Sequence, residues 1–165
     1  MRTIRLTFKQ TNFKQPKLNF MKRIIITLTL VFALGSTYSF ASDVKVSSTV
    51  IQSFKARFAD AENISWSVTN GFYVAEFTSE DKKQYAYFNP AGELTVVAEP
   101  LTVNQLTKKQ QANLHKDYSN YAIVDVYKLT DNDDVKYFVV VEDASKKIIL
   151  KTTTSSWDVV QTTSK

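Results

Sequence analysis

The chain has 165 residues, 44% of them hydrophobic and 13% aromatic, with three Gly, three Pro and no Cys. This composition suits one domain with a packed core and excludes a disordered chain. The lack of Cys excludes disulfides, thiol catalysis and Cys-ligated zinc. The net charge is +5, but seven of the 21 basic residues and none of the 16 acidic ones lie in Met1–Ala41. The rest carries 14 basic against 16 acidic residues, about −2, which argues against a nucleic-acid partner.

The first 41 residues have the pattern of a leader. Met21-Lys22-Arg23 is a basic start, and the twelve residues Ile24–Gly35 are predominantly apolar, which is too short for a membrane span and typical of a signal peptide. Ser39 and Ala41 are small, so we expect cleavage between Ala41 and Ser42. The sequence therefore predicts a mis-assigned extension at 1–20, a signal peptide at 21–41 and an exported domain at 42–165, periplasmic or secreted. An uncleaved anchor helix and a functional extension are the alternatives.

The first half of that domain reads as a helix followed by four strands. Ser47-Ser48 can cap a helix running to Phe58, because apolar residues recur on one side of it. Strands are predicted at 64–68, 72–78, 84–88 and 93–98. Asn70-Gly71 is a strong hairpin signal, and Asn89–Gly92 is a turn with Pro and Gly in favourable positions.

The second half repeats this pattern. Glu99-Pro100 is expected to break the chain, and Thr107 can cap a helix over 108–118. Four more strands are predicted at 122–129, 135–142, 146–152 and 157–161. The halves align with a near-constant offset, so we predict two repeats, about 44–99 and 100–161. The predicted fold class is α+β: two tandem α-β-β-β-β units forming an antiparallel sheet, with the helices packed on one face.

Three segments carry a resemblance to a known family. The runs Val50–Trp66, Asn70–Phe77 and Tyr87–Leu94 resemble the PepSY-like secreted proteins of Bacteroidetes, also called beta-lactamase-inhibitor-like after the fold that they share with that inhibitor. The resemblance covers nearly all of residues 44–160, more loosely in the second half, where Ser155-Ser156 replaces the Ala91-Gly92 of the first. It implies an exported protein that binds or inhibits another protein, and it implies no catalytic residues.

A search for chemistry leaves few candidates. His115 is the sole histidine and lies on a predicted helix among polar residues. Asp131, Asp133 and Asp134 resemble the start of a calcium loop, but the Gly and Glu that such a loop needs further on are absent. Glu76 is the most unusual carboxylate, since it lies mid-strand between Ala75 and Phe77. We therefore predict no catalytic residue, no metal site, no cofactor and no enzymatic activity.

Strand alternation sorts the side chains onto two faces of the sheet. One set should pack on the helices. The opposite set is unusually apolar for a solvated face, and such patches usually mark binding surfaces. Mutual packing of these residues across the strands, or a register error of one residue, is the alternative. The predicted binding residues are Phe72, Val74, Glu76, Tyr85, Tyr87, Phe138 and Ile149.

Three functions are compatible with these patterns. The first is an exported module that binds an envelope protein or peptide, in the manner of an inhibitor. The second is a structural or stress-response protein of the periplasm without a discrete ligand. The third is a small hydrolase that uses a carboxylate pair. The lack of a nucleophile motif or a phosphate-binding loop favours the first two.

Overall fold

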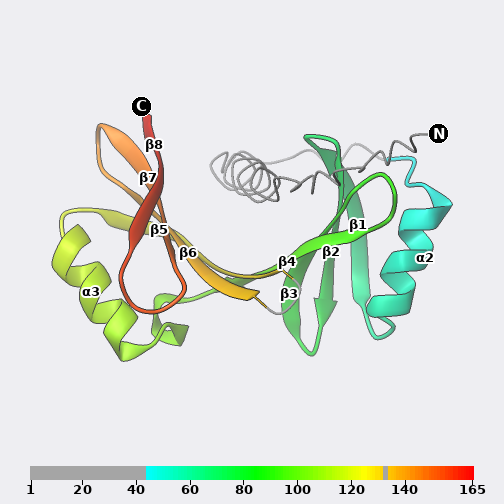
Figure 1. Ribbon diagram of the computed structural model, residues 1–165, viewed down its shortest axis with the longest axis horizontal. Coiled ribbons are helices and arrows are strands. Elements are labelled where there is room, and N and C mark those ends of the chain that lie inside the picture. The colour runs from blue at the N-terminus through cyan, green and yellow to red at the C-terminus, as the bar shows by residue number, and fades with distance from the viewer. Residues whose placement is uncertain (1–43, 132–133) are drawn as a thin grey trace, which may run out of the picture.

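The computed structural model describes residues 44–131 and 134–165. Strands make up more than half of this part, arranged in one eight-stranded antiparallel sheet. The elements are α2 (Ser48–Arg57), β1 (Glu62–Thr69), β2 (Phe72–Ser79), β3 (Lys82–Phe88), β4 (Leu94–Leu101), the 3₁₀ helix η1 (Val103–Gln105), α3 (Lys108–Tyr118), β5 (Ala122–Asp131), β6 (Asp134–Glu142), β7 (Lys146–Thr152) and β8 (Asp158–Ser164). The helices α2 and α3 lie at opposite ends of the molecule (Figure 1).

The α+β prediction of two tandem helix-and-sheet units is wrong. The fold is mostly β, since one uninterrupted sheet accounts for it and the helices have only 10 and 11 residues. A separate boundary was also wrong, since Glu99-Pro100 was expected to break the chain but continues β4 and pairs with Lys128 and Tyr127 of β5. Proline is tolerated there because β3 pairs with β4 only as far as Ala98, so one side of the strand has no ladder to interrupt.

The helix α2 is fixed by its N-terminal cap and one aromatic cluster. The Ser47 hydroxyl accepts a hydrogen bond from the Val50 amide, as an N-cap should. One turn later Phe54 is buried, with its ring 5.1 Å from that of Phe77 and 5.3 Å from that of Trp66. Ala75, Phe77, Ala86 and Phe88 are therefore buried beneath α2, with Tyr73 and Trp66 at the edge.

The side chains of Gln110 and Asn113 tie the helix α3 to the turn between β7 and β8. Gln110 forms a capping box with Thr107, and its side-chain amide donates to the carbonyl of Thr154. The Trp157 indole in turn donates to the Gln110 carbonyl at 3.0 Å. Leu114 packs beside these contacts on Val139, Val141, Ile148 and Leu150, with Tyr137 at the edge.

Strands β4 and β5 join the two halves of the sheet through a short ladder. Only Val97–Leu101 pairs with Val126–Thr130. The two strands are therefore staggered, and the first four residues of β5 extend past the end of β4. Of these four, Ala122, Ile123 and Asp125 pair with β6, and Val124 lies at a shift in the β5–β6 register. Because of this stagger, the first four residues of β5 have no neighbouring strand on the side of β4 within the described part of the chain.

An aspartate organises the turn between β6 and β7. The Asp143 carboxylate accepts hydrogen bonds from the Ser145 hydroxyl, the Ser145 amide and the Lys146 amide. The hydrogen bonds from Ser145, ahead of those from Lys146, hold the pKa of Asp143 below its ordinary value.

We expect Asp143→Ala to lower the free energy of unfolding near neutral pH and to lose its effect in acid. A carboxylate with a depressed pKa stabilises the fold above its unfolded-state pKa, and this contribution disappears as the pH falls through the folded-state pKa. Urea unfolding of wild type and variant at a series of pH values tests this. Asp60→Ala, which removes an exposed carboxylate in the other half, corrects for the change in net charge. A deficit that stays constant into acid would contradict the assignment.

The predicted leader and its cleavage site lie outside the described residues, and the division into repeats stays a prediction. Within the described residues, no helix is both long and apolar enough to cross a bilayer.

Candidate binding face

The sheet has two faces with different neighbours. We call the face toward α2 and α3 face B and the opposite face A. Residues from six strands, β2 to β7, form one apolar cluster on face A, whose buried members are Val74, Tyr87, Val96, Ala98, Leu129, Phe138, Val140 and Ile149. This cluster crosses the β4–β5 ladder, whereas the two clusters on face B each belong to one half of the sheet.

The structure places all seven predicted binding residues on face A. Val74, Tyr87, Phe138 and Ile149 lie in the cluster and are only 3–5% exposed. Phe72 and Tyr85 are half-buried against the cluster, and Glu76 is half-buried opposite Tyr85. The expected alternation is therefore confirmed. The four buried residues pack against one another across the strands, as the alternative interpretation of this face predicted. Atoms that a partner can touch without rearrangement belong to the half-buried residues.

An ion pair sits beside Tyr85 on face A. The Lys83 Nζ lies 2.6 Å from Oε1 of Glu76 and 5.4 Å from the centre of the Tyr85 ring. The hydrogen bond to Glu76 is the main reason that the pKa of Lys83 is raised. Glu76 therefore has a cation as its neighbour, whereas a glycosidase-type pair needs a second carboxylate.

Two residues of β5 belong to this face and were not predicted. Tyr127 is packed against the cluster, opposite Phe138, and burial raises the pKa of its hydroxyl. Asp125 lies two residues earlier on the same strand, and burial likewise raises the pKa of its carboxyl, against the opposing effect of Lys147. The alternation along 122–129 would have placed both on this face, had β5 been included in the face assignment.

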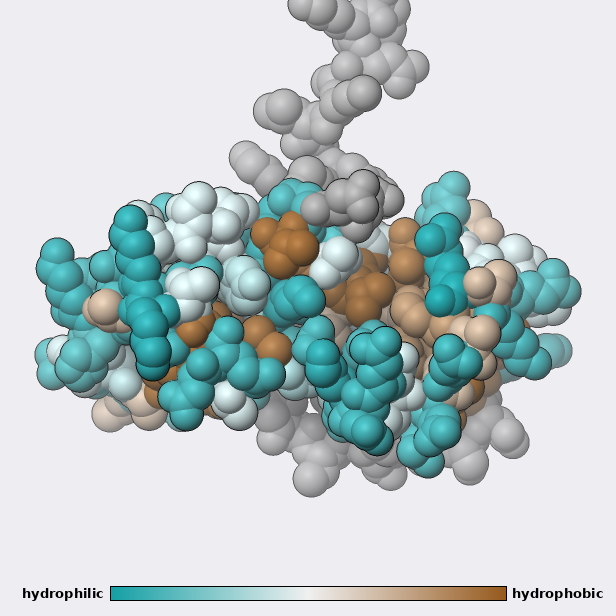
Figure 2. All heavy atoms as spheres, turned by 90° about the horizontal axis from the view of Figure 1, so that it is seen from below, coloured by the Kyte–Doolittle hydropathy of each residue, from teal (hydrophilic) through white to brown (hydrophobic). Residues whose placement is uncertain are grey.

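Face B offers less continuous apolar surface between the helices. Glu99 of β4 lies 3.5 Å from the Nζ of Lys128 and 3.9 Å from that of Lys82, which puts charges in the middle of this face. Seen from below, the molecule shows separate groups of apolar side chains among hydrophilic ones (Figure 2). Charged groups therefore interrupt the apolar side chains of face B where β4 meets β5.

The other described candidates, His115, Asp131 and Asp134, lie on three different elements, α3, β5 and β6. His115 lies in the last turn of α3. Asp131 and Asp134 form the final pair of the β5–β6 ladder, and Asp134 forms an ion pair with Lys136, while Asp133 lies outside the described residues. Over 44–131 and 134–165, no three His, Asp or Glu residues are grouped to hold a metal ion.

No family model matches the chain, and no curated protein matches it either. Solved structures do share the fold. A candidate periplasmic protein from Bacteroides eggerthii aligns with a TM-score of 0.63 at 16% identity, covering 72% of this chain and 88% of that one. A BLIP-like protein from Bacteroides fragilis aligns with a TM-score of 0.62 at 18% identity, covering 74% and 89%. A DUF2874 family protein from Bacteroides ovatus aligns with a TM-score of 0.62 at 20% identity, covering 71% and 86%. At these identities the likeness is one of fold, and the PepSY-like assignment stays a prediction.

Proposed function

We propose that this chain is an exported, non-enzymatic binding module that takes an envelope protein or peptide on face A, in the manner of an inhibitor. The observation that carries the proposal is the apolar cluster across six strands, with Phe72, Tyr85 and Tyr127 half-buried at its surface. Large aromatic side chains of this kind give much contact area for little loss of conformational entropy, and they are frequent at the centres of interfaces.

Each predicted binding residue has a part in this arrangement. Phe72, Glu76 and Tyr85 make the direct contacts, since they retain exposed atoms. Val74, Tyr87, Phe138 and Ile149 form the buried layer against which those side chains pack. This buried layer lowers the entropic cost of binding, because the contact residues are already held in place.

Two further observations favour export and binding. Fold neighbours include a BLIP-like protein and a candidate periplasmic protein. The leader pattern at 21–41 points to the same compartment, and cleavage after Ala41 would leave Ser42 as the first residue of the mature protein. A partner in the periplasm or outside the cell fits both.

The main experiment is capture of partners from envelope extract by the immobilised protein. We expect Tyr85→Ser to weaken the captured interaction at least about tenfold, because removing a central aromatic contact at an interface costs about 2 kcal/mol or more. Tyr85→Phe should retain most of the binding, since it keeps the ring. Val159→Ser is the matched control, because Val159 is 56% exposed and lies on β8 opposite Leu150 of face B.

If Tyr85→Ser, or a double variant that adds Tyr87→Ser, still recovers every partner in unchanged amount, binding does not occur through face A. A structural or stress-response protein without a discrete ligand would then be the better explanation. A hydrolytic activity that is lost on replacing Glu76 with Gln would instead support the carboxylate-pair enzyme.

A further inference from the structure

The first four residues of β5 form an edge inside an otherwise paired sheet. The β4–β5 ladder ends at Leu101 opposite Val126, after which the chain turns away into η1. Among the described residues, no strand pairs with Ala122–Asp125 on the side of β4. Backbone donors and acceptors at such an edge are a template for another extended segment.

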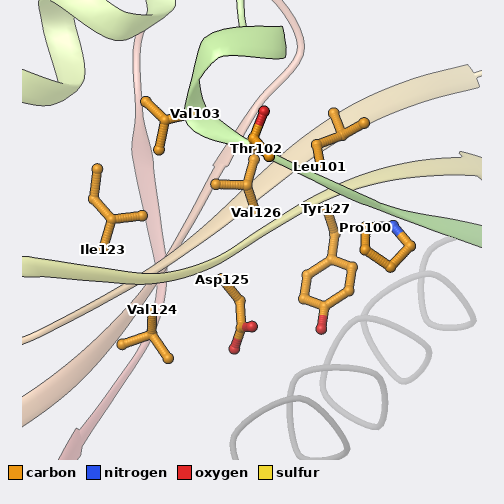
Figure 3. A pocket seen from close by; sticks show the side chains of 9 residues that line it. All are labelled: Pro100, Leu101, Thr102, Val103, Ile123, Val124, Asp125, Val126 and Tyr127. Carbon is orange, nitrogen blue, oxygen red and sulfur yellow. The ribbon is translucent and has the colours of Figure 1, made fainter. Parts of the chain in front are cut away.

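A groove lies beside this edge. It has a volume of about 210 Å³ and is bounded by the departing segment Pro100–Val103 and by residues 123–127 of β5. Figure 3 shows Ile123 and Val126 on one side of the β5 ribbon, with Val124, Asp125 and Tyr127 on the other. The groove therefore follows the strand edge and reaches side chains of both faces.

Apolar side chains from both segments line the groove together with three polar ones, those of Thr102, Asp125 and Tyr127. Ile123 and Val124 are 41% and 43% exposed, among the most exposed large apolar residues of the described chain. Asp125 is half-buried beside them, and within the described residues no hydrogen bond or ion pair is formed by its carboxylate. The nearby Lys147 has its own ion pair, with Glu142 at 3.9 Å. A partly desolvated carboxylate of this kind gains most from a cation supplied by a partner.

We propose that the edge Ala122–Asp125 binds an extended peptide segment by strand addition, and that a Lys or Arg side chain of this segment pairs with Asp125. The main chain of the peptide takes the place that β4 leaves, while β-branched or aromatic side chains cover Ile123 and Val124. Asp125 and Tyr127 lie on the same side of β5, so the Lys or Arg side chain that pairs with Asp125 lies on face A. The inference rests on the proposed function and names the kind of partner segment that it takes.

The test is selection of random peptides of about seven residues, displayed on phage, on the purified protein. We expect the enriched peptides to carry a Lys or Arg at one fixed position, with β-branched or aromatic residues at alternate positions. Asp125→Asn should weaken binding of the synthesised peptide roughly tenfold, and Asp125→Lys should select Asp or Glu at the same position. Asp158→Asn, which removes an exposed carboxylate on the far edge strand β8, should leave binding unchanged.

Backbone methylation separates strand addition from side-chain binding alone. Methyl groups on one alternate set of peptide amides should abolish binding, and those on the other set should not, because alternate amides of a strand face its partner. Equal effects of the two sets of methyl groups would overturn the inference. Failure to enrich any peptide would also overturn it, as would peptide binding that is unchanged by Asp125→Asn. If no peptide binds, and if the protein forms a dimer that dissociates when Asp125 is replaced by Asn, the inference is wrong and the edge binds a second copy of this chain.

The outcomes distinguish this inference from the broader proposal. Tyr85 lies on β3 and does not line the groove, so Tyr85→Ser should weaken partner capture without weakening the selected peptide. If peptides fail but Tyr85→Ser still weakens capture, the groove assignment alone is wrong. If peptides bind but Tyr85→Ser has no effect on capture, binding through face A is wrong.

Discussion

Replacing Phe54 with alanine is expected to lower the free energy of unfolding by about 3–5 kcal/mol, the range for deleting a buried aromatic side chain. Phe54 is 2% exposed and its ring lies within 6.2 Å of four others, those of Phe58, Trp66, Phe77 and Phe88. The cavity would remove the main attachment of α2 to the strands. Such a loss is a large part of the 5–15 kcal/mol typical of a domain, so the variant should unfold at much lower urea concentration.

Phe58→Ala is the matched comparison for this prediction. Phe58 is half-buried at the end of α2 and its ring contacts those of Phe54 and Phe77. Phe58→Ala removes the same atoms from a more exposed site. We therefore expect it to lower the free energy of unfolding by roughly half as much as Phe54→Ala, or less. Equal losses for the two variants would mean that the aromatic cluster is not centred on Phe54.

Gly92→Ala is expected to cost about 2–4 kcal/mol, from two separate causes. Gly92 has a φ of +84°, a conformation that L side chains rarely adopt. It also packs against α2, where an added Cβ would lie 3.0 Å from the Thr49 methyl group and 3.2 Å from the Thr49 carbonyl oxygen. Because these contacts include helix backbone, the clash can be relieved only by moving α2 or the turn.

Gly71→Ala isolates the conformational part of this cost. Gly71 has nearly the same φ, +82°, but nothing lies within 4 Å of an added Cβ. We expect it to cost about 1 kcal/mol, so the difference between the two variants measures the close approach of the turn to α2. Thermal or urea unfolding of both variants checks this, and equal effects would show that the turn and the helix can separate freely.

Local sequence signals located the elements well. Both helices and all eight strands lie within a few residues of their predicted positions. Asn70 and Gly71 both have positive φ, as the hairpin signal requires. The end of β4 was missed for a reason beyond local signals, since Glu99-Pro100 reads as a break but lies in β4, where pairing with β5 outweighs its low strand propensity.

The candidate face was predictable in outline only. Alternation assigned Val74, Tyr87 and Ile149 to the correct side of the sheet. It did not predict their burial, because the period of a strand gives the direction of a side chain and not the closeness of its neighbours. The groove at Asp125 was missed because it depends on the stagger between β4 and β5, which is a property of the sheet register.

The order of the strands in the sheet is their order along the chain. Each strand can thus find its partner by closing a short loop, at little entropic cost, in every case but one. Between β4 and β5 the chain must first traverse η1 and α3, so this is the longest loop to close. Formation of that ladder is therefore the step expected to limit the folding rate, and the two ends of the sheet should acquire hydrogen-exchange protection before its middle does.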